Sequence, residues 1–599
     1  MTVEHREGEK AGAWNPGIKS TLPAAYLPLS TMFQAENVFS SLETATELSD
    51  FTGLPIQQLV FFRPERLVIH ELLIRVSADI FVSDGTRYED LGINFRNVVS
   101  RILSSYIEPE MEAICERHMV LCEQARSIVE QALSVSIFVP PTKVEEPRAG
   151  FSLSRLFGSA KKKAVPVASE TAHQREQRIL LDWDDQANSS NDRLLSAVYR
   201  ELARVARAIV VKHGRLVGDK ALLTTLATGL VGNSFGSEII GEAIAPIVAR
   251  AAEVEELPVL RAQAEPIVIN VKGASASGKS TMRPLQQKHA EKLGIHWHDF
   301  ALISPDIWRK FLLDYDALGP ACKYAGTLVG DEIPIVDQKL DRYIAQKAEQ
   351  GRIFHLLIDR FRFDSFAPGK DSEEGSNLLT RFGHTIYLLF MVTPPEATVE
   401  RAWLRGLQVG RFKAVDDLLA HNVEAFKGIP ALFFTWALRK DKIVHYEFLD
   451  NSVAHGNKPR TIAFGLNGEM YILDFKCMLD IVRYTKININ ADDATQVYPG
   501  GDAMDSASNT EFLVKCAAKI PTINFVDRAS AKIYASMEFG KMSWIDPDMI
   551  QQKMGDEAVA AAFNAMVPNF NEGLAAVRQA PAIALSEEAR LPIIGCLSE

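Results

Sequence analysis

The feature that most constrains the fold is an apolar run that leads into a glycine-rich loop at residues 267–281. The run 267–271 reads Ile-Val-Ile-Asn-Val, which is typical of a buried parallel strand. Gly273 and Gly278 then allow a turn too tight for residues that carry a Cβ. Lys279 and the residues after it open a helical stretch. This order of strand, loop and helix predicts a phosphate-binding loop of the form G-x-x-x-x-G-K-S.

The residue types of this loop indicate its chemistry. Successive backbone N–H groups and the helix N-terminus would wrap a phosphate, Lys279 would reach its outer oxygens, and the Ser280 hydroxyl would hold Mg²⁺. A glycine-rich turn without nucleotide is the alternative, but only a phosphate site needs the Lys-Ser pair at this point. We therefore predict ATP and Mg²⁺ as cofactors. The residues expected to contact the phosphates are Gly273, Ala274, Ser275, Ala276, Ser277, Gly278, Lys279, Ser280 and Thr281.

Length and charge limit the remaining classes of function. At 599 residues the chain is long enough for about three or four domains. Its apolar fraction of 47% is ordinary for a soluble protein, and its net charge of −11 argues against a general nucleic-acid coat, which needs a basic surface. The six cysteines show no C-x-x-C pair, and the N-terminus lacks an apolar secretion signal. We expect reduced thiols and a cytoplasmic location.

One segment requires a test for membrane insertion. Between Lys220 and Glu238 the chain carries no charged residue over 17 positions. The segment is rich in Ala, Gly, Thr and Ser, whereas a membrane span needs about 20 predominantly apolar residues. Small residues of this kind suit closely packed buried helices. We predict no membrane span.

The N-terminal part is expected to be helical, in two blocks joined by a linker. Apolar residues recur at three- and four-residue spacing between Glu110 and Leu133, which predicts a long amphipathic helix, and Leu67–Val82 is a second helical segment. Prolines and clustered charges between the two blocks cannot sustain a packed helix. The predicted division is an N-terminal helical domain at 1–136, a linker at 137–180 and a second helical block at 181–262.

From residue 263 onward, strands and helices are expected to alternate, which indicates an α/β fold. The strands predicted after the loop are 300–306, 352–359, 385–392 and 442–448, with a hairpin around Leu466-Asn-Gly-Glu469. We predict a P-loop kinase core with a parallel sheet at 263–490. The N-terminal helical domains and a mainly helical C-terminal region at 491–599 would flank it.

Two acids lie where ligands collect in an open parallel sheet, at the carboxyl ends of strands. Asp306 ends the strand after the loop, where a second substrate would meet the phosphate, and we predict that it is the general base. Its alternative role is that of a helix cap. Asp359 ends a later strand and is expected to hold Mg²⁺ together with Ser280.

Arginines on a mobile segment would supply the remaining positive charge that phosphoryl transfer needs. Arg401 and Arg405 lie four residues apart on one predicted helix face, a repulsive pair that an anion would relieve. Arg405 and Arg411 lie nearer the predicted lid turn, so we favour them over Arg401. A solvated helix face is the alternative for each. The predicted catalytic residues are Lys279, Asp306, Arg405 and Arg411.

Three stretches together resemble one family. Ser277-Gly-Lys-Ser-Thr-Met-Arg283, Ile303-Ser-Pro-Asp-Ile-Trp-Arg309, and Gly410-Arg-Phe412 followed by a helix with His421-Asn-Val423 are similar to the zeta-toxin kinases, relatives of polynucleotide kinases. The resemblance covers roughly residues 265–450. It implies that a P-loop lysine and a strand-end acid carry the transfer and that lid arginines bind ATP phosphates.

The resemblance also implies an acceptor hydroxyl on a nucleotide sugar, such as UDP-N-acetylglucosamine, or on a related nucleotide. This sequence departs from the family at two points. Asp359-Arg-Phe-Arg362 stands where the family has Glu-Gly-Thr, and Ser304-Pro305 replaces the usual approach to the second-strand acid. The first departure bears directly on the identity of the acceptor.

The leading hypothesis is an ATP-dependent kinase that phosphorylates a hydroxyl of a small molecule. A second hypothesis is an ATP-driven switch or assembly protein without an acceptor, whose helical flanks would bind a protein partner. A third is a polynucleotide end kinase, for which Arg360, Arg362 and Lys370 would form a strand-tracking patch. The acidic net charge weighs against nucleic acid.

Overall fold

The computed structural model describes residues 11–87, 89–138, 171–360, 377–454, 456–567, 583–590 and 592–597. The chain divides into two compact units, each assembled from separate stretches of sequence. The first unit comprises Met1–Thr31, Leu72–Ser104 and Val248–Glu599, and the second comprises Met32–Glu71 and Ser105–Ile247. The predicted domains are continuous in sequence, and their independent folding stays a prediction. Residues 139–170 of the predicted linker lie outside the described residues.

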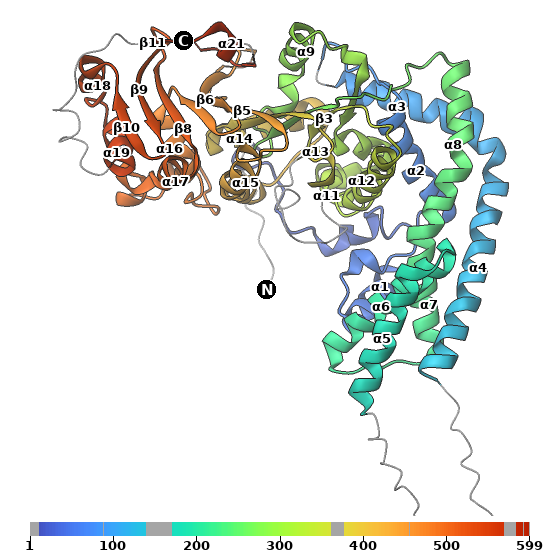
Figure 1. Ribbon diagram of the computed structural model, residues 1–599. Coiled ribbons are helices and arrows are strands. Elements are labelled where there is room, and N and C mark those ends of the chain that lie inside the picture. Colours follow the sequence, from blue (N-terminus) through green and yellow to red (C-terminus); the bar gives the residue numbers. More distant parts are fainter. Residues whose placement is uncertain are drawn as a thin grey trace, which may run out of the picture. The chain divides into compact units, whose positions relative to one another are not determined.

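The first unit is built on one mixed sheet, which runs in the order β10-β9-β8-β7-β6-β5-β4-β1-β3-β2, with β11 paired to β9 (Figure 1). The predicted α/β class is therefore confirmed. The strands are β1 (Ile267–Lys272), β2 (Phe300–Ile303), β3 (His355–Asp359), β4 (Thr385–Val392), β5 (Ile443–Asp450), β6 (Arg460–Leu466), β7 (Glu469–Ile472), β8 (Thr522–Asp527), β9 (Lys532–Glu538), β10 (Lys541–Trp544) and β11 (Ile583–Ala584).

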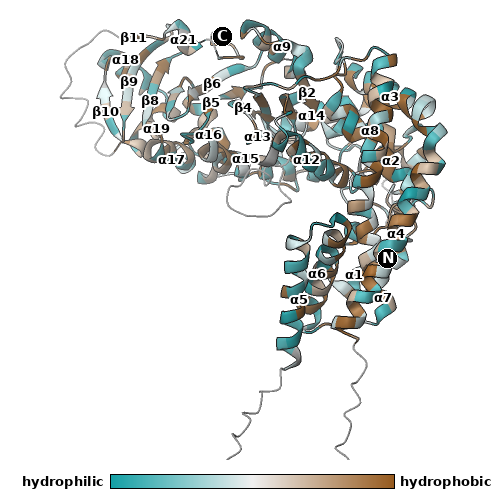
Figure 2. Ribbon diagram, turned by 45° about the vertical axis from the view of Figure 1, so that its right-hand side comes forward, coloured by the Kyte–Doolittle hydropathy of each residue, from teal (hydrophilic) through white to brown (hydrophobic). Residues whose placement is uncertain are grey.

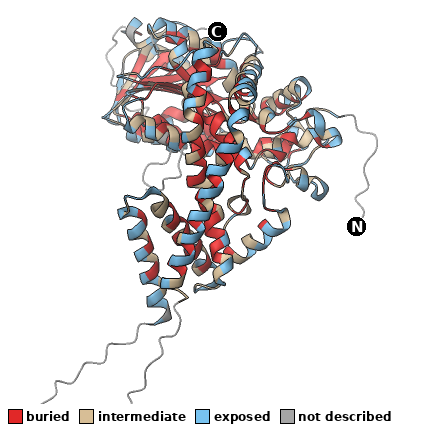
Figure 3. Ribbon diagram, turned by 90° about the vertical axis from the view of Figure 1, so that its right-hand side faces the viewer, coloured by how far each residue is buried: buried red, intermediate tan, exposed pale blue. Residues whose placement is uncertain are grey.

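The five strands from β5 to β2 are all parallel, as the sequence predicts for the kinase core. They are buried almost throughout, and Figure 3 shows them red between helices whose outer faces are exposed. Helix α9 (Arg283–Lys292) covers one face, while α12 (Ile333–Glu349) and α15 (Val415–Ala437) cover the other (Figures 1 and 2). Because the strands are parallel, their carboxyl ends meet at one edge of the sheet.

The sheet continues beyond β5 as a largely antiparallel extension. Strands β6 and β7 form the predicted hairpin, in which Asn467 adopts the positive φ of +46° that the turn requires. Strand β8 joins β7 in parallel, and β9 and β10 follow antiparallel. In the C-terminal region 491–599 the predicted helices are present, but strands β8 to β11 also lie there and were not predicted. The helices from β7 onward are α16 (Phe475–Arg483), α17 (Glu511–Lys519), α18 (Pro547–Lys553), α19 (Glu557–Met566) and α21 (Glu587–Arg590).

The second unit is a helical bundle. Its core surrounds Trp183, Leu202 and Leu226, which are almost completely buried. Figure 2 shows α5 largely hydrophilic and α7 richer in hydrophobic residues, which fits a buried position for the uncharged segment tested above. The helices of this unit are α1 (Leu42–Thr52), α4 (Met111–Ser136), α5 (Ala172–Ser189), α6 (Arg193–His213) and α7 (Lys220–Val231), and the division between the units falls within α2 (Pro64–Asp79) and α8 (Ser237–Val254). Across the described residues, none of the helices combines the length and the apolar character needed to span a bilayer.

A further set of helices belongs to the first unit. The short 3₁₀ helices η6, η8 and η9 surround the loop and the residues after β2. The helices concerned are α3 (Asp90–Ile102), η6 (Lys279–Met282), η8 (Pro305–Trp308), α10 (Arg309–Leu312), η9 (Asp316–Tyr324), α11 (Ala325–Leu328), α13 (Asn377–Thr380) and α14 (Pro395–Val409).

Candidate phosphoryl-transfer site

The loop between β1 and η6 has the backbone conformation that its glycines predict. Gly278 has a φ of +98°, in the region that residues with a side chain rarely adopt. Gly273 is required for a different reason, because a Cβ there would lie 2.7 Å from Ser277 Oγ and 2.8 Å from Met391 Cβ. Ala276 also has a positive φ, of +61°. A strained loop held on a buried strand is typical of a functional site.

Lys279 is folded back onto this loop. Its ammonium Nζ donates to the carbonyl oxygens of Gly273, at 3.1 Å, and Ala274, at 2.9 Å. Burial lowers the pKa of the ammonium; Arg405 and Arg411 add to this, while Asp359 and Asp306 oppose it. These four charged groups include all the other predicted catalytic residues. The fold therefore brings the predicted catalytic set into one electrostatic neighbourhood.

Ser280 and Asp359 form the pair predicted to hold Mg²⁺. The Ser280 hydroxyl donates to Asp359 Oδ2 at 2.7 Å, and Asp359 is aligned with Val271 across the parallel strands β1 and β3. Mg²⁺ prefers oxygen ligands and is usually bound by one or two protein groups together with waters and substrate phosphates. A hydroxyl and a carboxylate beside a phosphate loop fit that description. Among the residues that the structure describes, there is no group of three or more His, Cys, Asp or Glu that could hold a metal by itself.

Asp306 is held by two arginines. Its Oδ1 accepts from Arg309 Nε at 2.9 Å and forms an ion pair with Arg411 Nη2 at 2.7 Å. Desolvation would raise the pKa of Asp306, although its side chain is 48% exposed, but Arg411 and Arg309 outweigh this effect and hold the pKa well below its usual value. In this arrangement Asp306 is fully ionised and weakly basic. It can accept a substrate proton only after an arginine has moved away.

The helix-cap alternative for Asp306 is not supported by the structure. The residue lies inside η8, whose N-cap is Ser304, and no side chain makes a capping hydrogen bond there. The next helix, α10, also begins without a side-chain cap. The contacts of the Asp306 carboxylate described above are with arginines of the site, so the local helix geometry does not explain this acid.

The two arginines on α14 point to different places. Arg401 Nη2 donates to the backbone carbonyls of Asn451, at 2.7 Å, and Val453, at 3.3 Å. Arg405 lies one turn further along and acts electrostatically on Lys279. The two arginines therefore have different surroundings. Arg401 is bound to backbone carbonyls after β5, whereas Arg405 acts on Lys279.

Lys413 belongs to this group of charges although no role was predicted for it. Its Nζ lies 2.6 Å from His421 Nδ1 on α15. Burial lowers the pKa of Lys413 to about 7, and Arg411, Arg405 and Arg309 contribute to the decrease, while Asp417 opposes it. Lys413 directly follows the resembling stretch Gly410-Arg-Phe412, and its partner His421 lies eight positions further along the chain.

Tyr315 is a second residue that the sequence did not reveal. Its ring is buried, and its hydroxyl has no hydrogen-bond partner among the described residues. Burial raises the pKa of the phenol; Arg309, Arg411 and Arg405 oppose this, and Asp306 adds to it. The phenol therefore shares the electrostatic neighbourhood of Asp306 and its arginines. A buried orphan hydroxyl is costly, which makes it a candidate for contact with a substrate.

Arg360 does not contribute to a nucleic-acid patch. Its guanidinium is buried and forms ion pairs at 2.6 Å with Asp337 and Asp341 of α12. Its backbone carbonyl accepts from the buried Lys272 at 3.1 Å. The predicted role of Arg360 in a strand-tracking surface is therefore wrong, because its guanidinium is buried and is already paired with two carboxylates. The other two members of that patch, Arg362 and Lys370, lie outside the described residues.

Comparisons with known proteins add little to this geometry. No protein-family model matches the chain, and no curated protein matches it. Among solved structures, the chain is similar to one from the PezAT chromosomal toxin–antitoxin system of the human pathogen Streptococcus pneumoniae, at 18% identity and a TM-score of 0.24. That match covers 34% of this chain and 76% of the other. A TM-score this low carries no argument about activity. The functional proposal therefore rests on the residues of the site.

Proposed function

We propose that the protein is an ATP-dependent P-loop kinase of the zeta-toxin type. It transfers the γ-phosphoryl group of ATP to a hydroxyl of a small molecule, such as a nucleotide sugar or a nucleotide. The observation that carries the proposal is that Lys279, the Ser280–Asp359 pair, Asp306 and Arg411 meet at the carboxyl ends of β1, β2 and β3.

The loop binds the nucleotide first. Its backbone N–H groups and Lys279 surround the β- and γ-phosphates. Lys279 leaves its two loop carbonyls in order to bind these phosphates. Ser280 and Asp359 would hold Mg²⁺, which when bound would supply positive charge to the phosphate oxygens. Arg405 and Arg411 are close enough to Lys279 to add their charge to the same anion.

Movement of Arg411 onto the phosphates activates the base. Once its ion pair with Arg411 is broken, Asp306 retains Arg309 as a partner and regains proton affinity. Asp306 then takes the proton of the acceptor hydroxyl, whose oxygen forms a bond to the γ-phosphorus. The bond between that phosphorus and the β–γ bridging oxygen breaks, and ADP leaves with the electron pair. Binding of ATP and activation of Asp306 are thereby coupled.

The experiment that tests the proposal incubates the protein with γ-labelled ATP and a metabolite extract and then identifies the compound that gains the label. Transfer to one small molecule that carries a hydroxyl is the expected result. Release of inorganic phosphate with no labelled product from any fraction would contradict the proposal and favour the ATP-driven switch. Labelling of added oligonucleotide ends alone would favour the polynucleotide end kinase.

A further inference from the structure

The carbonyl oxygen of Ser277, inside the phosphate loop, is the target of side chains from three other parts of the first unit. Asn451 Nδ2 donates to it at 2.7 Å, and Thr393 Oγ1 donates at 3.0 Å. Arg401 Nη1 lies 3.5 Å from the same oxygen. Ser277, Asn451 and Thr393 are all buried. One loop carbonyl thus receives donors from the ends of β4 and β5 and from helix α14.

This carbonyl fixes the direction of the next N–H group. The chain has no cis peptide bond among its described residues, so the Gly278 N–H points opposite to the Ser277 carbonyl. Because the carbonyl is directed at Thr393 and Asn451, the Gly278 N–H is directed away from the ends of β4 and β5. A phosphate loop binds its anion through such N–H groups, and a carbonyl turned inward in their place would repel the anion.

Within the loop, the Ser277 N–H donates to the Ala274 carbonyl at 3.2 Å and the Thr281 N–H donates to the Gly278 carbonyl at 3.1 Å, while the donors to the Ser277 carbonyl described above come from outside the loop. Ala276 and Gly278, on either side of Ser277, both have positive φ, a conformation that is costly for alanine. Gly278 also packs directly against the amide, since a Cβ there would lie 2.3 Å from Asn451 Nδ2. Contacts from outside the loop are needed to keep such a conformation as the dominant one.

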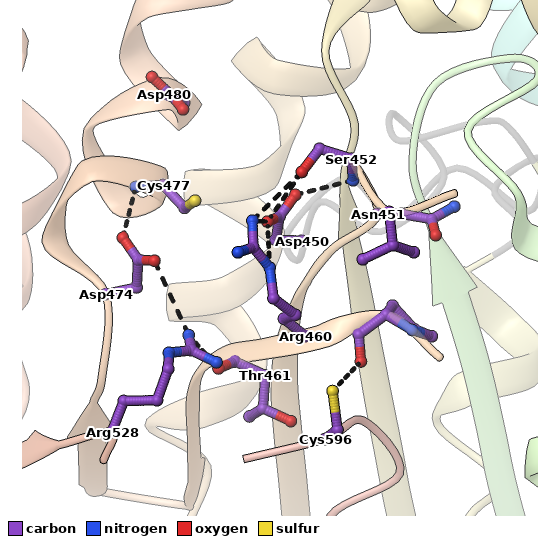
Figure 4. A network of polar contacts seen from close by, with 12 residues as sticks. Asp450, Asn451, Ser452, Arg460, Thr461, Asp474, Cys477, Asp480, Arg528 and Cys596 are labelled. Carbon is purple, nitrogen blue, oxygen red and sulfur yellow. Dashed lines mark hydrogen bonds and ion pairs between the residues drawn. The ribbon is translucent and has the colours of Figure 1, made fainter. Parts of the chain in front are cut away.

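Asn451 is held through its backbone, since its N–H donates to the Val392 carbonyl at 2.9 Å and its carbonyl accepts from Arg401 Nη2 at 2.7 Å. The residues on either side of it belong to a network that reaches the antiparallel extension (Figure 4). The adjacent Asp450 is buried, accepts from the Ser452 backbone N at 2.8 Å and forms an ion pair with Arg460 of β6. Arg460 Nε donates to Asp450 Oδ2 at 3.0 Å. In Figure 4 Asp450, Ser452 and Arg460 point toward one another, while the side chain of Asn451 is turned away from them.

We propose that Asn451 is a positioning residue for nucleotide binding. Its amide orients the Ser277–Gly278 peptide so that the Gly278 N–H faces the phosphate, and the Asp450–Arg460 pair holds Asn451 in register with the loop. This inference rests on the proposed function, since it assigns the loop to nucleotide. Strand β6, which lies outside the parallel core, thereby contributes to the geometry of the site.

The test measures the affinity for Mg-ATP, by calorimetry on the full chain, alongside the melting temperature without nucleotide. Asn451→Asp keeps the shape of the side chain, removes the donor and places a carboxylate against the Ser277 carbonyl. Affinity is expected to fall by about 10- to 100-fold, the range for loss of a buried hydrogen bond that leaves its partner unsatisfied. Arg460→Gln, which does not touch the loop, is expected to weaken binding by about threefold to tenfold.

Asn509→Asp provides the matched control. Asn509 is also a buried asparagine, and its Nδ2 donates to the backbone carbonyls of Ala503, at 3.0 Å, and Asp505, at 2.7 Å, in the C-terminal region. Its substitution is expected to lower the melting temperature and to leave Mg-ATP affinity unchanged. A merely structural role for Asn451 would give the same pattern.

The outcomes separate this inference from the proposed function. If the wild-type protein binds no Mg-ATP, the proposed function fails. If the wild type binds and Asn451→Asp binds equally well, only the positioning role is overturned. Should Asn451→Asp not fold, Thr393→Val removes another donor to the same carbonyl and is expected to weaken Mg-ATP binding. Unchanged affinity in that variant would contradict the proposal.

Discussion

The two halves of the candidate site are built differently. On the phosphate side, Lys279 and Ser280 are neighbours in sequence, and their contacts are with the loop backbone and with Asp359. On the acceptor side, Asp306 and Arg309 lie three residues apart, while Arg411 comes from a distant segment, and both arginines form ion pairs with the one carboxylate. The first half is closed by hydrogen bonds of Lys279 and Ser280, whereas the second is closed by ion pairs. Under the proposed function, nucleotide would bind first and its phosphates would open the acceptor half.

The largest expected effect comes from the phosphate side. Lys279→Ala removes the ammonium that would face the γ-phosphate, while the loop backbone keeps its strand and helix supports. Transfer is expected to fall by about 10³- to 10⁵-fold, the range for a cation that stabilises the transferring phosphoryl group. The measurement is steady-state turnover together with circular dichroism. A folded variant with normal turnover and normal ATP affinity would exclude this loop as the site.

Asp306→Asn should separate binding from chemistry. The substitution keeps the size of the side chain but removes the base, so transfer is expected to fall by about 10²- to 10⁴-fold. Mg-ATP affinity should stay the same or increase, because Arg411 is no longer held by a carboxylate. Transfer assays, calorimetry and melting curves check this on one preparation. If the folded variant keeps full transfer, Asp306 has no part in the mechanism and the acceptor half is placed wrongly.

The depressed pKa of Lys413 predicts a pH dependence of nucleotide binding. With a pKa of about 7, the free protein loses this charge as the pH rises above 7, whereas bound phosphates favour the protonated form. Mg-ATP affinity should therefore fall by up to about tenfold per pH unit above 7, with proton uptake on binding at pH 8. Calorimetry in buffers of different ionisation enthalpy measures that uptake. Lys413→Met should abolish it, and uptake that persists in this variant would assign the proton to another group.

The same residue also affects stability, and its sign follows from the two pKa values. The unfolded chain holds the Lys413 proton up to its ordinary pKa of 10.5, while the folded protein releases it near 7. Between these two pH values the unfolded state binds more protons than the folded state. The free energy of unfolding therefore increases as the pH rises. Lys413→Met is expected to remove this slope, which denaturant titrations at pH 7 and pH 9 would show.

The smallest expected effect concerns Tyr315. Tyr315→Phe removes a buried hydroxyl that has no hydrogen-bond partner among the described residues, so the free energy of unfolding should rise by about 1 kcal/mol. If that hydroxyl contacts the acceptor, transfer should fall by about twofold to tenfold with ATP affinity unchanged. Tyr446→Phe is the control, because the Tyr446 hydroxyl donates to the Glu469 carbonyl at 2.7 Å and its loss should destabilise without affecting transfer. Transfer at the wild-type rate in Tyr315→Phe would remove Tyr315 from the acceptor half.

The sequence by itself determined the phosphate half of the site. Gly273, Gly278, Lys279 and Ser280 act through backbone conformation and through chemistry within a few residues of one another, so their spacing is sufficient to predict the loop. The parallel strands and the acids at or just beyond their ends were also predictable, because a buried strand is a continuous apolar run and parallel strands end at one edge. Asp359 was found in this way.

Only the tertiary structure decided the rest. The contact of Asn451 with Ser277 joins residues 174 positions apart, and no local pattern encodes such a pairing. The same holds for the Arg411–Asp306 ion pair, and for the burial of Arg360 against α12, which reversed its predicted exposure. Strands β8 to β10 were missed because short apolar runs suit a strand or a helix equally until a neighbouring edge is available to pair with them. Side-chain partners and sheet edges are set by packing across the chain, whereas the loop is set by the covalent neighbours of each residue.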